Sequence, residues 1–318
     1  MKKKISFFIL FLLVILAAKA QQEPTYSHYM FLKPYINAGF TGAKKTINAS
    51  ILNSNMFVGM GEGRPTTSVF GVEAPFEMFG TRNGIGLFIM SDEVGFQRNV
   101  NVNLSYAHHH KMQGSNLSGG ISVGIMNYNI VNPEWIVVDT ESDEFIPNEE
   151  MSQVNVGINV GAFYENDTYS IGLSATNLNL PKVIYANTNT LETNLYFYQP
   201  NIYLMGAYNI ALPDPLFDLQ PTFLLSTDLA AYEFKLNATM FYNKKYRWGL
   251  GIKIDQYKLA ALTVLAGMEL ISGLDIGYAM NINNALFMGG ATSHEVLVTY
   301  SFNLEGKRDQ KYKSIRYL

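Results

Sequence analysis

Residues 99–107, with the sequence NVNVNLSYA, decide the fold of this chain. Apolar residues at 100, 102, 104 and 106 alternate with the polar residues at 99, 101, 103 and 105. Side chains two residues apart lie on the same face of a β-strand, whereas a helix would need a spacing of three or four. The segment is therefore predicted to be a strand with one apolar and one polar face.

The same period-two pattern recurs along the chain from residue 47 onward. In one later example, the apolar residues Val154, Val156 and Ile158 alternate with Asn155, Gly157 and Asn159. We expect about fourteen strands, an even number typical of single-chain bacterial barrels. They are predicted near residues 47–58, 66–74, 84–92, 99–110, 116–131, 152–165, 168–177, 197–211, 220–229, 232–242, 246–255, 257–270, 273–283 and 294–304.

Alternation alone fits both a soluble sandwich and an outer-membrane barrel, which differ in where the apolar face points. The strands run to roughly 9–12 residues, the length that spans a membrane, whereas soluble strands average about 5–6. Aromatic residues gather at strand ends, as in the interfacial girdles of barrels, for example at Tyr164, Tyr242 and Trp248. The fold class is therefore predicted to be all-β, a transmembrane antiparallel β-barrel.

Composition excludes several classes of function. Lys and Arg total 23 against 26 Asp and Glu, so the chain lacks the basic surplus of a nucleic-acid binder. There are 0 cysteines, which excludes disulfide scaffolds, thiolate metal sites and cysteine nucleophiles.

The chain is predicted to have four regions. Residues 1–20 have the basic start, apolar run and small-residue end of a signal peptide, with cleavage near Ala20. Residues 21–46 are aromatic-rich, and we expect a plug or periplasmic segment anchored by apolar residues. Residues 47–304 form the barrel, and the basic residues 305–318 form a periplasmic tail that contacts lipid, stays disordered or docks a partner. The proposed anchors of the plug are Tyr29, Met30 and Phe31.

The connections between strands predict the orientation of the barrel. Those at 166–167, 243–245 and 271–273 are short, whereas 132–151, 178–196 and 284–293 are mostly long. Outer-membrane barrels have short periplasmic turns and longer extracellular loops. We therefore expect an integral outer-membrane protein whose barrel begins and ends on the periplasmic side, with both termini periplasmic.

Few residues suggest chemistry. The acidic connection contains Asp139, Glu141 and Asp143, which alternate as in some calcium loops but lack the glycine of an EF-hand. It is interpreted as solvated surface, or alternatively as a calcium-bridged or partner-facing loop. The run 108–110 is three histidines, but neighbouring strand residues point to opposite faces, so at most two could share a metal. We expect no cofactor other than this possible calcium.

An enzyme is not expected either. Ser293, His294 and Glu295 are adjacent, and neighbours on a strand diverge, which is the wrong geometry for a catalytic triad. The charged residues on the polar faces are predicted to line the lumen and to pair across neighbouring strands. These are Glu233, Lys235, Arg247, Lys253, Asp255, Asp275 and Glu295.

Several short motifs are distributed over the predicted mature chain. They begin with the sequence QEPTYSHYMF at residues 22–31 and NAGFTG at 37–42. They continue through GRPTT at 63–67, IGYA at 276–279, SHEV at 293–296 and KSIRYL at 313–318. Together, in this order and spacing, they resemble the PorP/SprF family of type IX secretion system membrane proteins. Where the family usually has Asn-Pro-Ala-Tyr, this chain has Asn-Ala-Gly-Phe at 37–40.

The resemblance implies a non-enzymatic barrel that serves protein secretion and gliding motility in Bacteroidota-type cells. Its expected partners are a secreted surface protein carrying a type IX C-terminal domain and the periplasmic ring and motor components. Besides the plug anchors and the acidic loop, His294, Glu295, Lys313 and Arg316 are candidate partner-binding residues. The first alternative is a general solute channel or hydrophobic-compound transporter. The second is a purely structural barrel that tethers the envelope to peptidoglycan, against which counts that the sequence shows no peptidoglycan-binding domain.

Overall fold

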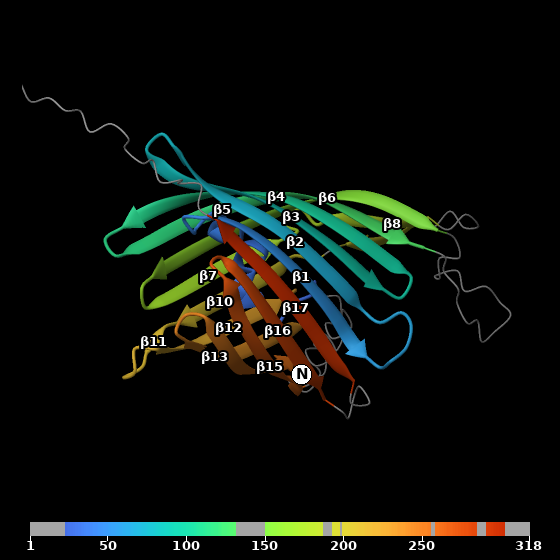
Figure 1. Cartoon of the computed structure of the whole chain (residues 1–318). Coiled ribbons are helices and arrows are strands. Elements are labelled where there is room, and N and C mark those ends of the chain that lie inside the picture. Colours follow the sequence, from blue (N-terminus) through green and yellow to red (C-terminus); the bar gives the residue numbers. More distant parts are fainter. Residues whose placement is uncertain are drawn as a thin grey trace, which may run out of the picture.

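The computed structural model describes residues 23–131, 150–186, 193–197, 199–255, 258–284 and 291–302. These residues form an antiparallel β-barrel, shown in Figure 1. Its fourteen wall strands confirm the predicted fold class and strand number. The strands are β1 (Ile47–Val58), β2 (Thr66–Met78), β3 (Thr81–Val94), β4 (Gln97–Met112), β5 (Ser115–Ile130), β6 (Met151–Asn166), β7 (Tyr169–Thr176), β10 (Asn201–Tyr208), β12 (Phe217–Thr227), β13 (Tyr232–Tyr242), β14 (Tyr246–Asp255), β15 (Lys258–Ile271), β16 (Leu274–Asn283) and β17 (Thr292–Phe302).

The barrel is closed through hydrogen-bonded pairs between sequential strands and between the first and last strands. β1 pairs antiparallel with β17, with Ile47 opposite Phe302, and β10 pairs with β12. Closure leaves no open sheet edge around the ring, which a membrane requires because an unpaired backbone group in hydrocarbon costs several kcal/mol.

The apolar faces of the strands point outward, as predicted. The exposed fraction is 57% for Leu104, 55% for Ile125 and 67% for Leu250. The polar residues that alternate with them face the interior, for example Ser105 and Asn237, which are buried. An apolar outer surface and a polar interior are the arrangement of a barrel in lipid rather than of a soluble sandwich.

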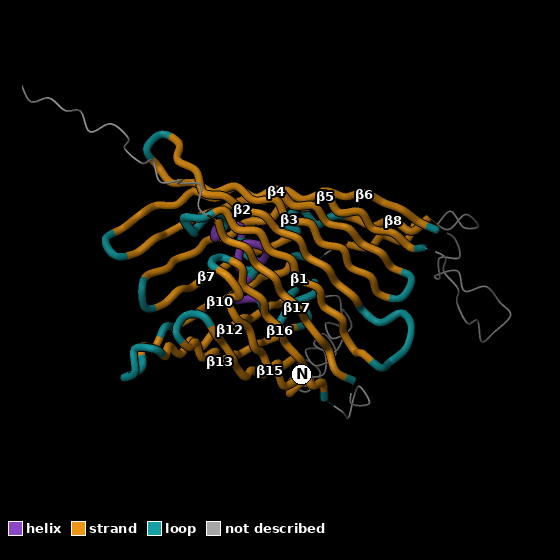
Figure 2. Tube along the Cα trace, in the orientation of Figure 1, coloured by secondary structure: helices purple, strands orange, loops and turns teal. Residues whose placement is uncertain are grey.

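The two ends of the barrel differ, and we name them by their connections (Figure 2). The short-turn end carries the turns 79–80, 113–114, 167–168, 243–245 and 272–273, the start of β1 and the end of β17. The long-connection end carries the connections 131–150, 177–200 and 284–291, together with shorter ones. This distribution matches the predicted sorting of short and long connections, except that the longer connection 209–216 lies at the short-turn end.

The structure differs from the prediction in the connection after β7. Here β8 (Lys182–Ala186) and β9 (Thr193–Phe197) form a separate two-stranded sheet. The strand predicted from residue 197 therefore begins only at Asn201, because Phe197 belongs to this hairpin. A two-residue strand, β11 (Ile210–Ala211), also pairs with β12 beside the ring.

Helices occur only before the barrel in the described part of the chain. They are the 3-10 helix η1 (Tyr29–Phe31), the one-turn α2 (Lys33–Ile36) and the 3-10 helix η2 (Ala38–Phe40). Within the described ranges, no helix combines the length and the apolar character needed to cross a membrane.

The lipid-facing assignment predicts the effect of a charge on the outer wall. Leu250→Arg on β14 is expected to destabilise the barrel by about 2–4 kcal/mol if the position lies near the bilayer midplane. Leu250→Ala, which only shortens the side chain, should cost clearly less. Unfolding in lipid vesicles measures both values; equal effects of the two substitutions would contradict an outward, lipid-facing Leu250.

Candidate functional site

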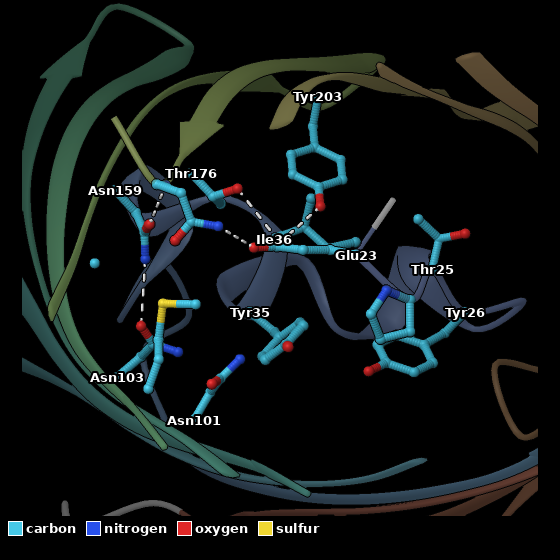
Figure 3. Close-up of a pocket in the computed structure, with 14 residues that line it drawn as sticks. Glu23, Thr25, Tyr26, Tyr35, Ile36, Asn101, Asn103, Asn159, Thr176 and Tyr203 are labelled. Carbon is cyan, nitrogen blue, oxygen red and sulfur yellow. Dashed lines mark hydrogen bonds between the residues drawn. The ribbon is translucent and has the colours of Figure 1, made fainter. Parts of the chain in front are cut away.

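The most distinctive site is the stretch that precedes the barrel, residues 23–43, here called the N-terminal segment. Its side chains are buried by the wall strands: the exposed fraction is 1% for Tyr26 and Tyr29 and 0% for His28 and Asn37. Figure 3 views this segment inside the ring of strands. The lumen of the barrel therefore contains the chain's own N-terminal segment, as its hydrogen bonds with strands around the ring also show.

Lumen-facing glycines make room for the backbone of the segment. A β-carbon on Gly84 would collide with the carbonyl oxygen of Thr41, and one on Gly120 would collide with that of Ala38. A β-carbon on Gly161 would collide with the side chain of Asn37. The inner wall is thus shaped for this segment at three strands, since no other residue would permit such close approach.

Glu295 on β17 holds the first turn of the segment. Its carboxylate accepts hydrogen bonds from the backbone N–H of Ser27 at 2.8 Å and of His28 at 3.2 Å. The Nδ1 atom of His28 lies 3.3 Å from the same carboxylate, and both side chains are buried. A buried carboxylate with these partners is stabilised only while the segment is in place.

A second charged cluster lies on β13 and β14. The Glu233 carboxylate lies 3.4 Å from Lys235 Nζ and 3.1 Å from Lys253 Nζ, and it accepts a hydrogen bond from the Thr25 hydroxyl. Arg247 pairs with Asp275 and lies 4.4 Å over the ring of Phe31. Of these pairs, only the Glu233–Lys253 pair joins neighbouring strands as predicted, because Glu233 and Lys235 share β13 and the Arg247–Asp275 pair reaches past β15 to β16. Glu233 and Arg247 also contact the N-terminal segment.

Glu23 attaches the start of the segment to β7 and β10. It accepts hydrogen bonds from Tyr203 at 2.9 Å, from Asn177 at 2.5 Å and from Thr176 at 3.3 Å (Figure 3). Burial raises the pKa of Glu23, and these hydrogen bonds partly oppose that shift. A cavity of about 40 Å³ remains between Glu23 and the asparagine-rich wall of β4 and β6.

The last residues of the segment contact further wall strands, from β2 to β6. Asn37 donates to the carbonyl oxygen of Ala162 at 3.0 Å, and the Thr41 carbonyl accepts from His109 Nε2 at 2.8 Å. The backbone N–H of Gly42 donates to Glu73 at 2.7 Å. Hydrogen bonds therefore follow the segment along its whole length.

Lys33 lies between two aromatic rings. Its ammonium is 5.0 Å from the ring centre of Phe40 and 5.4 Å from that of Phe163, and those rings pack edge to face. Burial lowers the pKa of Lys33 to about 8. The charged form is therefore less favourable in the folded protein than in the unfolded chain.

This shift predicts a pH dependence. Between the folded pKa near 8 and the unfolded value of 10.5, the unfolded chain binds more protons at Lys33 than the folded protein does. The free energy of unfolding should then rise as the pH increases through this window. Thermal unfolding at pH 7 and pH 9.5, compared between wild type and Lys33→Met, isolates the contribution of Lys33. An identical pH response of the two proteins would contradict it.

The predicted partner-binding residues lie in different places. Tyr29 and Met30 are buried in an apolar cluster inside the barrel, with Phe31 packed against it. Glu295 faces the same interior, whereas His294 contacts Tyr278 at 2.6 Å on the other face of β17. Whether any of them binds a partner stays a prediction. Asp139, Glu141, Asp143, Lys313 and Arg316, and the signal peptide, lie outside the described residues.

The histidine run divides between two faces. His109 is buried and binds the N-terminal segment, whereas His108 and His110 are exposed. In the described ranges, no group of three or more His, Cys, Asp and Glu side chains is placed to hold a metal ion. The calcium site stays a prediction for the acidic connection.

Sequence reasoning missed the roles of Glu23, His28 and Glu73. Each is a polar residue without a recognisable spacing, and its partners are far away in the chain. A signal was available for Glu73, because a carboxylate on the lumen-facing side of a strand requires a partner. No pattern indicated which partner it would be.

These features define a class of protein: an outer-membrane β-barrel whose lumen contains its own N-terminal segment. The sequence matches the family described as "Type IX secretion system membrane protein PorP/SprF" over residues 18–300. The chain therefore belongs to this family, as its motifs predicted, and is an outer-membrane component of the type IX secretion system. Family and fold together imply a non-enzymatic role.

Two solved structures with a TM-score of 0.50 support the fold, and a third is similar at a lower TM-score. The toluene transporter TbuX of Ralstonia pickettii has a TM-score of 0.50 at 10% identity, covering 84% of this chain and 92% of that one. The monoaromatic hydrocarbon channel CymD has a TM-score of 0.50 at 9% identity, covering 90% and 95%. The outer membrane protein Omp33 of Acinetobacter baumannii has a TM-score of 0.48 at 5% identity, covering 82% and 100%. No match was found among curated protein sequences.

Proposed function

We propose that this barrel supports the export or surface anchoring of a secreted partner protein, such as an adhesin or gliding protein, through the partner's C-terminal secretion domain. Membership of a type IX secretion family supports a role with secreted cargo and secretion machinery. The observation that carries the proposal is the filled lumen. Two cavities between the N-terminal segment and the wall, within the described residues, measure about 40 and 20 Å³, too small for a polypeptide to pass. The partner must then bind at the surface of the barrel.

The long-connection end is the proposed face for the secreted partner. By the pattern of outer-membrane barrels it is extracellular. It carries the acidic connection with Asp139, Glu141 and Asp143, the connection that contains the β8–β9 hairpin, and residues 284–293. The periplasmic ring and motor components are proposed to meet the short-turn end, where the basic tail with Lys313 and Arg316 follows β17.

A channel for solutes or hydrophobic compounds is the second candidate. TbuX and CymD, which transport or conduct aromatic hydrocarbons according to their names, share the fold. Against this function, the segment occupies the lumen and is hydrogen-bonded to strands around it. A channel role would require the segment to leave the lumen.

Comparison of surface proteins between wild-type and deletion cells tests the proposal. We expect one or a few surface proteins with type IX C-terminal domains to disappear from the cell surface, while other cargo of the system persists. Complementation with the intact chain should restore them. Loss of all cargo would instead indicate a core component of the machine, and unchanged surface proteins together with impaired uptake of aromatic hydrocarbons would favour the channel.

A further inference from the structure

The direction of the N-terminal segment through the lumen can be read from its contacts. At its start, Glu23 binds Thr176 and Asn177. Thr176 is the last residue of β7, and Asn177 begins the long connection 177–200. Tyr203, the third partner of Glu23, lies near the start of β10 just after this connection. Glu23 is therefore at the long-connection end of these two strands.

The next contacts agree with this placement on strands further around the ring. Thr25 donates to Glu233, the second residue of β13 after the connection 228–231. Glu233 is also bound by Lys253, near the end of β14 at the same end of the barrel. Strands β7, β10 and β13 thus hold the first residues of the segment at the long-connection end.

The last contacts of the segment lie at the opposite end. Thr41 accepts a hydrogen bond from His109, which precedes the turn 113–114. Arg82, directly after the turn 79–80, donates to the carbonyl oxygen of Ala43. Residue 47 then begins β1, also at the short-turn end. Residues 23–43 therefore cross the lumen from one end of the barrel to the other.

We propose that the N-terminal segment is threaded through the lumen so that the amino-terminal end of the mature chain lies on the face that carries the long connections. The sequence predicted a plug or periplasmic segment but no direction for it through the lumen. The amino terminus would then belong to the face on which the proposed function places the secreted partner. The proximity of the amino terminus to a secreted partner rests on the proposed function. The direction of threading rests on the hydrogen bonds of the N-terminal segment alone.

Thiol labelling in whole cells tests the threading, because the chain contains 0 cysteines and any introduced thiol is unique. The test variant carries a Gly-Ser-Cys-Gly-Ser insertion between Gln22 and Glu23, whose flexibility keeps the thiol accessible. Two controls mark the ends of the barrel. Glu62→Cys lies in the exposed connection after β1 at the long-connection end, and Lys244→Cys lies in the exposed turn after β13 at the short-turn end.

The comparison uses a membrane-impermeant maleimide on intact and on permeabilised cells. We expect the inserted cysteine to be labelled in the same cells, intact or permeabilised, as the Glu62→Cys control. The extent of its labelling in intact cells should differ at least severalfold from that of the Lys244→Cys control. Reaction together with position 244 would overturn the threading. If position 244 reacts in intact cells and position 62 does not, the orientation used in the proposed function is wrong. The threading is then still decided by which control the inserted cysteine follows.

Discussion

Removing residues 23–43 is expected to convert a barrel that conducts few ions into an open pore. In the wild type, the segment fills the lumen between hydrogen-bonded strands, and two cavities beside it measure about 40 and 20 Å³. A barrel of this strand number without an internal segment encloses space for water and ions, so conductance should rise by on the order of tenfold or more. Single-channel recording in planar bilayers measures the change.

A point substitution tests the same claim with the full chain. Gly120→Val places a side chain against the Ala38 carbonyl and should displace the segment and raise conductance. Gly119→Val is the matched control, because a β-carbon at Gly119 meets nothing within 4 Å. Correct folding is checked by heat-modifiable migration on gels. Folded variants that conduct no more than the wild type, or equal effects of the two substitutions, would contradict closure of the lumen by the segment.

The second large effect is expected at Glu295. Glu295→Ala removes the acceptor of two backbone N–H groups and the partner of His28, all of them buried. Each buried donor left without its acceptor costs about 1–3 kcal/mol, so the loss of both N–H partners should cost several kcal/mol in total. Glu295→Gln keeps one acceptor oxygen and should cost less, about 1–3 kcal/mol. The N-terminal segment should also become more sensitive to protease in the alanine variant.

Val296→Ala provides the control for Glu295. Val296 is the next residue on β17, faces outward and is 46% exposed, so its truncation leaves the lumen unchanged. Denaturant unfolding in detergent or lipid and the rate of proteolysis of the segment are the two measurements. If Glu295→Ala matches Val296→Ala in both, the carboxylate does not hold the segment.

The wall of the barrel was predictable from the sequence because each strand carries its own signal. The alternation over 232–242 and 246–255 predicted β13 and β14 with the bounds that the structure has. The prediction was wrong at residue 197, where aromatic residues resembled the end of a wall strand. Phe197 instead pairs with Lys182 in the β8–β9 hairpin. Local composition cannot distinguish a strand of the ring from a strand beside it.

The interior was predictable only in part. A lumen lined by Glu233, Lys235 and Lys253 follows from strand alternation, because every second residue points inward. The bond between Ser27 and Glu295 joins residues that are 268 positions apart, and the segment has no periodicity that would indicate its path. Sequence patterns therefore predicted an ordered, aromatic segment, but neither its partners nor its direction through the lumen.

Affinity purification from native outer membranes in mild detergent tests the proposed function most directly. The tagged, full-length barrel is isolated and the co-purifying proteins are identified and quantified. The account predicts a secreted surface protein with a type IX C-terminal domain in near-equal amount, and its loss when that domain is removed from the partner. Recovery of the barrel with no secreted protein, from cells that export such proteins, would contradict it.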